Sequence, residues 1–280
     1  MNPVALRTPP SLWPLYARAA MTGPLHHGDT LPGSRYTLAD QAIDPDQLAA
    51  YQRVCGFRTT DVLPPTYLHV LAFPMTVALM SEQAFPFPLI GLVHVRNAIT
   101  TTRALRSDET VSFDVHATDL RAHPAGRQFD VLVNARIAGE TVWTGRSTYL
   151  RREGRAPHRP AEARPKTEPA RGARIRVPDD IGRRYGSVSG DRNPIHLSRV
   201  SAKLFGFRSA IAHGMWLKAR TLAALEGRLP DALSVDVAFK TPVFLPATVA
   251  LGTSRADEAW RLDVRDARTG KPHLSGTVSG

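Results

Sequence analysis

Two side chains with the chemistry of an acid–base pair lie five positions apart in the segment Ser-Gly-Asp-Arg-Asn-Pro-Ile-His, residues 189–196. They are the carboxylate of Asp191 and the imidazole of His196. Pro194 forces its predecessor Asn193 into extended geometry, so the pair is held on a turn or an extended loop rather than on a helix. Both groups can then face one cavity. A carboxylate and an imidazole that converge on one water molecule exchange protons with it near neutral pH.

A second segment, Ala-His-Gly-Met at residues 212–215, opens a helix that is apolar around most of its circumference. Such a helix is usually buried. Its N-terminus stabilises negative charge that develops nearby. His213 is a candidate for a second base, but its position at the helix start favours a structural role.

The residues around the acid–base pair resemble a known signature. Residues 185–196 (Tyr-Gly-Ser-Val-Ser-Gly-Asp-Arg-Asn-Pro-Ile-His) resemble that of the MaoC-like (R)-specific enoyl hydratases, also called hydratase 2. Residues 202–207 and 211–215 also match. The resemblance covers roughly 175–280, whereas over 36–150 it rests on the layout of the elements. A match of this length and order disfavours the alternative that residues 189–196 form only an Asx-turn with a surface histidine.

The resemblance implies a reaction: reversible addition of water to a trans-2-enoyl thioester, which gives an (R)-3-hydroxyacyl thioester in fatty-acid metabolism. Asp191 and His196 would grip the water and move its proton, and which of them is the base stays open. The backbone N–H of Gly214 is the expected donor to the thioester oxygen. Ser189 and Asn193 are expected to hold the loop and to hydrogen-bond the acid–base pair.

The elements that must position these residues form two similar halves. In the C-terminal half, a short strand at 174–177 precedes the loop and a buried helix is expected over 213–226. Alternating apolar and polar residues then predict strands at 234–240, 248–252 and 261–265. One buried and one solvated face indicate an antiparallel sheet. A sheet of this kind wrapped around one buried helix is the hot-dog arrangement.

The N-terminal half repeats this layout. A central helix is expected over 67–82, kinked by Pro74. Strands are expected at 93–95, 111–115, 131–137 and 141–143. The corresponding loop, residues 61–66, lacks a histidine. The predicted fold class is therefore α+β, a double hot-dog of two antiparallel sheets that each wrap a central helix, with one active site. An acyl tunnel between the halves is expected to be lined by residues such as Tyr67, Phe73 and Phe85.

Composition sets the expected domain boundaries. Residues 1–35, rich in proline and glycine, predict an N-terminal surface extension with a short surface helix near 12–20. A degenerate N-terminal hot-dog follows over 36–150. Residues 151–172 combine arginine with proline and predict a solvated linker, which leads to a catalytic hot-dog over 173–280.

Charge and cysteine content exclude several classes of function. The net charge of +11 is concentrated in the linker, with no basic helix or stacking platform, so nucleic acid is not an expected partner. Basic residues at a pocket mouth would instead suit the phosphates of coenzyme A or an acidic carrier protein. The single cysteine, Cys55, fits a reducing compartment, and we expect a cytoplasmic protein. No window of 18 apolar residues predicts a membrane span.

No cofactor or metal is expected beyond the thioester substrate. The ten histidines are scattered apart from His26-His27, and neither a Gly-x-Gly-x-x-Gly nor a Walker loop occurs. Two other functions stay open: a hot-dog thioesterase, and a non-catalytic acyl-binding subunit. The acyl chain length, the carrier and the physiological direction stay open, and the assembly is expected to be a monomer or a homodimer of double hot-dogs.

Overall fold

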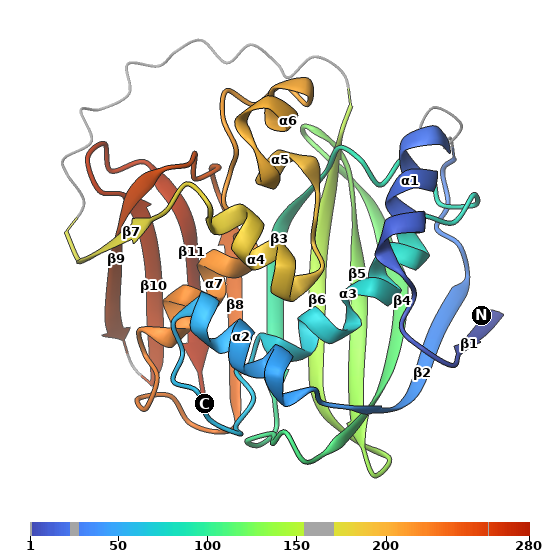
Figure 1. The fold of residues 1–280 in the computed structure, drawn as a ribbon, viewed down its shortest axis with the longest axis horizontal. Coiled ribbons are helices and arrows are strands. Elements are labelled where there is room, and N and C mark those ends of the chain that lie inside the picture. The colour runs from blue at the N-terminus through green and yellow to red at the C-terminus, as the bar shows by residue number, and fades with distance from the viewer. Residues whose placement is uncertain (1, 23–27, 154–170, 257) are drawn as a thin grey trace.

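The structure is a computed structural model that describes residues 2–22, 28–153, 171–256 and 258–280. Within these ranges eleven strands form one sheet, and the helices cover one of its faces (Figure 1). The strand order is β1-β2-β4-β5-β6-β3-β8-β11-β10-β9-β7. The strands are β1 (Asn2–Leu6), β2 (Ser34–Ala42), β3 (Leu92–Thr101), β4 (Thr110–His123), β5 (Gly126–Ile137), β6 (Glu140–Arg152), β7 (Ala173–Val177), β8 (Leu233–Phe239), β9 (Ala247–Ala256), β10 (Ala259–Asp266) and β11 (Pro272–Ser279).

The sheet consists of two antiparallel halves that join edge to edge. Strands β3 and β8 make the join, in a register that runs from Arg96 opposite Ala238 to Thr101 opposite Leu233. The parallel pair β1–β2 extends the sheet at the N-terminal edge. The predicted α+β double hot-dog is confirmed, with its two sheets continuous through β3 and β8.

Two of the helices are the predicted central helices. They are α3 (Tyr67–Met80) and α7 (Gly214–Ala223), and most of their residues are buried. Pro74 lies inside α3, which continues on both sides of it as one helix. The remaining helices are α1 (Leu12–Thr22), α2 (Pro45–Cys55), α4 (Ile181–Ser189), α5 (Pro194–Leu197) and α6 (Arg199–Leu204). None of the helices in the described part of the chain is both long and apolar enough to cross a membrane.

Some elements were expected from the sequence and others were not. The helix near residues 12–20 is α1, whereas the elements without a predicted counterpart include β1, β2, α2 and β11. Strand β1 joins the sheet, so the expected surface extension also contributes a strand. Strand β6 ends at Arg152 and β7 begins at Ala173, so most of the expected linker, residues 154–170, lies outside the described residues. The domain boundaries themselves stay a prediction.

The two halves share one core, because buried polar groups of one half find their partners in the other. Lys218 of α7 is fully buried, and its Nζ donates to the carbonyl oxygen of Asn97 (3.1 Å) and to the side-chain oxygen of the same residue (2.6 Å). Burial lowers the pKa of Lys218 well below its usual range. The indole of Trp216 donates to the carbonyl of Val54 in α2 at 3.0 Å. These contacts tie α7 to the N-terminal half.

Candidate active site

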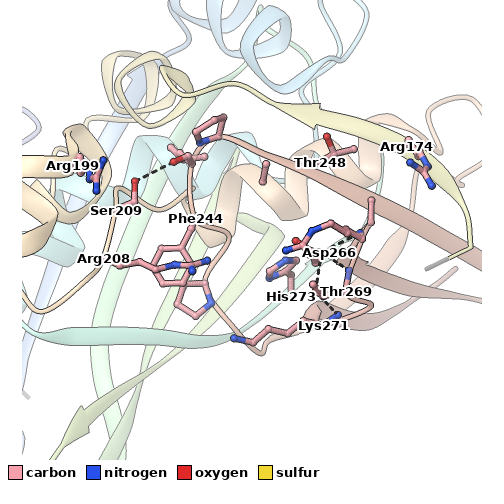
Figure 2. A pocket seen from close by; sticks show the side chains of 16 residues that line it. Arg174, Arg199, Arg208, Ser209, Phe244, Thr248, Asp266, Thr269, Lys271 and His273 are labelled. Atoms are coloured by element: carbon pink, nitrogen blue, oxygen red, sulfur yellow. Dashed lines mark hydrogen bonds between the residues drawn. The ribbon is translucent and has the colours of Figure 1, made fainter. Parts of the chain in front are cut away.

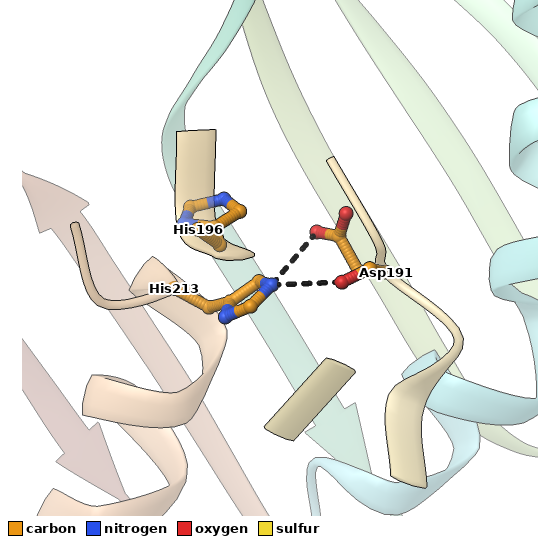
Figure 3. Close-up of side chains that lie close together, drawn as sticks. All are labelled: Asp191, His196 and His213. Atoms are coloured by element: carbon orange, nitrogen blue, oxygen red, sulfur yellow. Dashed lines mark hydrogen bonds and ion pairs between the residues drawn. The ribbon is translucent and has the colours of Figure 1, made fainter. Parts of the chain in front are cut away.

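Three ionisable side chains from separate elements lie close together at the N-terminus of α7. Asp191 lies in the loop after α4, His196 lies in α5, and His213 immediately precedes α7. Figure 3 shows the three side chains facing one another, and a carboxylate oxygen and one ring nitrogen from each histidine all lie within 4.8 Å of one another. The structure therefore brings together the two predicted acid–base groups and the histidine expected at the helix start.

Local hydrogen bonds fix the loop that carries Asp191. Helix α4 ends because Gly190 adopts the left-handed conformation, with a φ of 75°. The backbone N–H of Asp191 donates to Ser189 Oγ (3.2 Å), and Asn193 Oδ1 accepts from the N–H of Ile195 (3.4 Å) as the N-cap of α5. Ser189 and Asn193 thus bind the backbone of the loop.

His196 is held in one tautomer by the backbone. Its Nδ1 lies 2.8 Å from the carbonyl oxygen of Ile211, so Nδ1 carries the proton and donates it. Burial lowers the pKa of the imidazole below its usual 6.5, although Asp191 and the Ile211 carbonyl oppose the shift. At neutral pH, His196 is therefore uncharged, and its Nε2 is a basic lone pair.

His213 binds the backbone of the loop that carries Asp191. Its Nε2 donates to the carbonyl oxygen of Asp191 at 2.9 Å and lies 3.8 Å from Asp191 Oδ2. The ring stacks on His196, with 3.6 Å between the ring centroids. Burial, followed by repulsion from His196, lowers the pKa of His213 to about 3. A neutral ring whose Nε2–H is already engaged fits the positioning role that the sequence favoured.

Asp191 is ionised in this environment. Burial is the largest single influence and raises its pKa, but His213, His196 and two hydrogen-bond donors together lower it by more. The two donors favour the charged form: they are the backbone N–H of Asn193, at 3.2 Å, and the hydroxyl of Tyr16. The net pKa lies below its ordinary 3.8. The Asp191 side chain keeps 27% of its surface exposed, which leaves the carboxylate reachable for a ligand.

Tyr16 is a site residue that sequence reasoning missed. It lies on α1, and its hydroxyl donates to Asp191 Oδ1 at 3.3 Å across 175 positions of sequence. Burial and the neighbouring carboxylate both raise the pKa of Tyr16, so the hydroxyl stays protonated. The predicted surface helix therefore also reaches the site. No periodicity or motif in the sequence links α1 to this loop.

Two glycines of α4 were also missed. A Cβ added at Gly182 would lie 1.9 Å from the carbonyl oxygen of His196, and one at Gly186 would lie 2.9 Å from that of Asp191. Residues four apart share one face of a helix, so this face lets the backbone of the loop approach closely. The Gly-x-x-x-Gly spacing was the signal in the sequence that could have revealed it.

Gly214 is the first residue of α7, where backbone N–H groups have no partner within the helix. The preceding His213 gives them no side-chain cap. A Cβ at Gly214 would lie 3.0 Å from the ring of Phe239, which itself packs edge-on against His94 of β3, with 5.1 Å between the ring centroids. A donor at a helix N-terminus, bounded by side chains of both halves, suits an oxygen that gains negative charge.

One of the predicted tunnel residues, Tyr67, is connected to the site by a row of aromatic contacts. Tyr67, at the start of α3, packs on Tyr51, with 5.2 Å between the ring centroids. Tyr51 lies 6.2 Å from Tyr185, and Tyr185 lies 4.9 Å from His213. This row of rings connects the central helix of the N-terminal half to the candidate active site.

Phe85 and Phe73 lie farther along the N-terminal half. Phe85 is buried against Phe129 of β5, with 5.0 Å between the ring centroids, and Phe73 is half-buried 6.4 Å from His69. Their role as tunnel lining stays a prediction.

The cluster has the residue types of a metal site, but its hydrogen bonds favour water. In the carbonyl-bound tautomers, Nε2 of His213 and Nδ1 of His196 each use their proton on a backbone carbonyl. The groups left to accept are the Asp191 carboxylate and Nε2 of His196. A carboxylate oxygen and an imidazole lone pair can both bind a metal ion, but two ligands are one fewer than the three protein ligands of a catalytic zinc site, whereas they match a water molecule that donates two protons.

Comparisons with known proteins agree with the resemblance carried by residues 185–196. A family model described as "MaoC like domain" matches residues 159–276. The chain is 38% identical over 256 residues to 3-hydroxyacyl-thioester dehydratase X of Mycobacterium tuberculosis, covering 90% of this chain and 91% of the relative. A crystal structure of HtdX from the same organism has a TM-score of 0.79 at 37% identity, covering 88% and 99%. A MaoC-like dehydratase from Phytophthora capsici shares the fold, with a TM-score of 0.70 at 18% identity over 89% and 95% of the chains.

Proposed function

Because the chain belongs to the MaoC-like dehydratase family, we propose that it hydrates trans-2-enoyl thioesters reversibly to (R)-3-hydroxyacyl thioesters. One observation carries the proposal. The Ile211 carbonyl holds Nδ1 of His196 in its protonated form, which leaves Nε2 as a free base beside the ionised carboxylate of Asp191. This is the arrangement that water activation needs.

The two acceptors orient one water molecule. Its two O–H groups donate to the Asp191 carboxylate and to His196 Nε2, so an oxygen lone pair is left to face C3 of the enoyl group. The water is thereby both held and made more nucleophilic. His213 and Tyr16 support the arrangement, because they bind the carbonyl and the carboxylate of Asp191 respectively.

The addition then forms one C–O bond and transfers one proton from the water to the substrate. The oxygen of the water bonds to C3 while Asp191 or His196 takes a proton from it. The electron pair of the C2–C3 double bond moves toward the thioester carbonyl, whose oxygen the N–H of Gly214 stabilises at the start of α7. The same proton then passes to C2. One water is added in total, and the proposed step uses no cofactor.

Stereochemistry provides the test of this function. Purified protein should dehydrate an (R)-3-hydroxyacyl-CoA to the enoyl thioester, followed by the absorbance of the conjugated double bond, and should leave the (S)-enantiomer unchanged. A thiol reagent in the same cuvette reports hydrolysis. Turnover of the (S)-enantiomer, or thiol release that outruns formation of the enoyl thioester, would contradict the proposal and favour an (S)-specific hydratase or a thioesterase.

The pKa of His196 predicts how activity depends on pH. The reaction needs neutral His196 and ionised Asp191, and both pKa values are lowered. We expect kcat/KM for hydration to be constant at neutral pH and to fall only as the pH drops below 6.5, because protonation of His196 then removes the base. The measurement is a pH–rate profile, with circular dichroism at each pH to show that the fold persists. An acidic limb with its midpoint above 6.5 would contradict the assignment.

A further inference from the structure

Four aromatic rings form a row across the sheet, on the face that the helices cover. They are Phe129 of β5, Tyr149 of β6, His94 of β3 and Phe239 of β8, one from each of four neighbouring strands. The ring centroids are 5.7, 4.7 and 5.1 Å apart in that order. The ring of His94 also lies 6.0 Å from that of His69 in α3, so the aromatic row faces this helix.

One end of the aromatic row borders the candidate active site. The ring of Phe239 lies 3.0 Å from the position of a Cβ at Gly214, the expected donor to the thioester oxygen. The carboxylate of Asp191 is close enough to act electrostatically on both His94 and Tyr149. His94 therefore lies beside the groups that would bind the thioester oxygen and activate the water.

The other end of the aromatic row leads into the N-terminal half. Phe239 and His94 are half-buried, whereas Phe129 is fully buried and contacts Phe85. A cavity of about 1050 Å³ in the C-terminal half, lined by Phe244 among others, lies in the opposite direction along the sheet, and none of the four rings lines it (Figure 2). A group that follows the aromatic row from the site is thus enclosed by protein.

His94 carries an unused hydrogen-bonding atom in this enclosed region. Its Nε2 is buried and has no hydrogen-bond partner among the described residues. The hydroxyl of the adjacent Tyr149, in contrast, forms a hydrogen bond with Ser147. The backbone of Arg96 accepts a hydrogen bond from the imidazole of His94, so Nδ1 carries the proton and Nε2 keeps its lone pair.

The surroundings keep this imidazole uncharged. Burial, followed by repulsion from His69 and Lys218, lowers the pKa of His94 to about 3. At neutral pH the ring is therefore neutral, and Nε2 is an acceptor that lacks a donor. A buried acceptor without a partner is unfavourable, and most such groups in native proteins are paired.

The missing partner has the chemistry of a neutral donor. An alkyl chain packed against His94 would leave Nε2 unpaired, whereas a hydroxyl group would donate to it. A hydroxyl group also avoids the free-energy cost of moving a charged group from water into a region lined by aromatic rings.

We propose that Nε2 of His94 accepts a hydrogen bond from a hydroxyl group on the acyl chain beyond C3, so that the protein prefers hydroxylated enoyl thioesters to plain ones of the same length. This inference rests on the proposed function. With the thioester oxygen at Gly214 and C3 facing Asp191, the next carbons of the chain come to His94. The carrier has to stay outside, because the aromatic row leads into the core. Nε2 itself is covered, so the chain has to displace a neighbouring side chain when it binds.

The test compares trans-2-hexenoyl-CoA with its 4-hydroxy and 5-hydroxy derivatives. The readout is the ratio of kcat/KM for each hydroxylated substrate to kcat/KM for the plain one, because a loss shared by all three substrates leaves this ratio unchanged. We expect the wild type to favour at least one hydroxylated substrate by about tenfold or more, since a site that hydrogen-bonds a hydroxyl group discriminates strongly against the analogue that lacks it.

Two variants assign this preference to one atom. His94→Phe keeps a ring in the aromatic row and removes the acceptor, so the ratio should fall by about tenfold. Tyr149→Phe is the matched control, because it keeps the neighbouring ring and removes a hydroxyl that already has Ser147 as its partner. Its ratio should stay at the wild-type value.

Two results would overturn the inference while leaving the proposed function intact. One is a wild type that hydrates the plain thioester as well as both hydroxylated ones, a result that needs no variant to fold. The other is a wild-type preference that persists in His94→Phe or disappears in Tyr149→Phe instead. Failure of the wild type to hydrate all three thioesters would contradict the proposed function itself.

Discussion

Replacement of Asp191 by asparagine or of His196 by glutamine should each lower the rate of enoyl thioester hydration by ~100-fold to 10,000-fold, the usual range for general acid–base groups. Asparagine removes the charge and the proton-accepting power of Asp191. Its side-chain oxygen can still accept hydrogen bonds from the backbone N–H of Asn193 and from the hydroxyl of Tyr16. Glutamine places its amide near the position of Nε2, but this amide does not take up a proton at neutral pH.

The measurement is kcat on the best enoyl thioester, together with the melting temperature of each variant. Both variants should fold as the wild type does, because the contacts that hold the loop persist. Conversion of Tyr16 to phenylalanine is the milder companion, since it removes one donor to Asp191 and leaves both reacting groups in place. If either Asp191→Asn or His196→Gln keeps near wild-type turnover, the water-activation assignment is wrong.

Conversion of Gly182 to alanine should lower both activity and stability, because it disturbs the backbone of the segment that carries His196. The added Cβ would lie 1.9 Å from the carbonyl oxygen of His196, so the loop has to move away from α4. Overpacking of this kind typically costs about 1–3 kcal/mol of unfolding free energy. A shift of the reacting group by about 1 Å can cost roughly 100-fold in rate.

Urea unfolding and kcat measure the two effects separately. Ser187→Ala is the matched control, because Ser187 lies on the exposed face of the same helix. The control should leave kcat unchanged. Wild-type kcat and stability in Gly182→Ala would show that the close approach of α4 to the loop does not position His196.

Much of the fold could be predicted from the local pattern of apolar and polar residues. The central helices α3 and α7 were predicted because their apolar residues cover nearly the whole circumference, which is the pattern of a buried helix. Strand β11 was not predicted, because His273, Ser275 and Gly276 break the alternation of apolar and polar residues that is typical of a half-buried strand. Helix α2 was missed even though Asp44 caps it and Pro45 opens it, a start signal that the sequence does contain.

The candidate site likewise has residues that could be predicted from the sequence and residues that could not. Asp191 and His196 could be predicted because one loop of eight residues carries both and Pro194 gives that loop its geometry. Tyr16 could not, because only the packing of α1 against the loop brings its hydroxyl to Asp191.

The central claim is that the protein adds water to C3 of an enoyl thioester with the thioester bond intact. The most direct test is turnover of a trans-2-enoyl-CoA in water labelled with a heavy oxygen isotope, with the products identified by mass spectrometry. We predict an intact thioester that has gained one water, with the label at C3, and formation of this product by Asp191→Asn that is slower by ~100-fold or more. Label in a free carboxylic acid, accompanied by released coenzyme A thiol, would contradict the account.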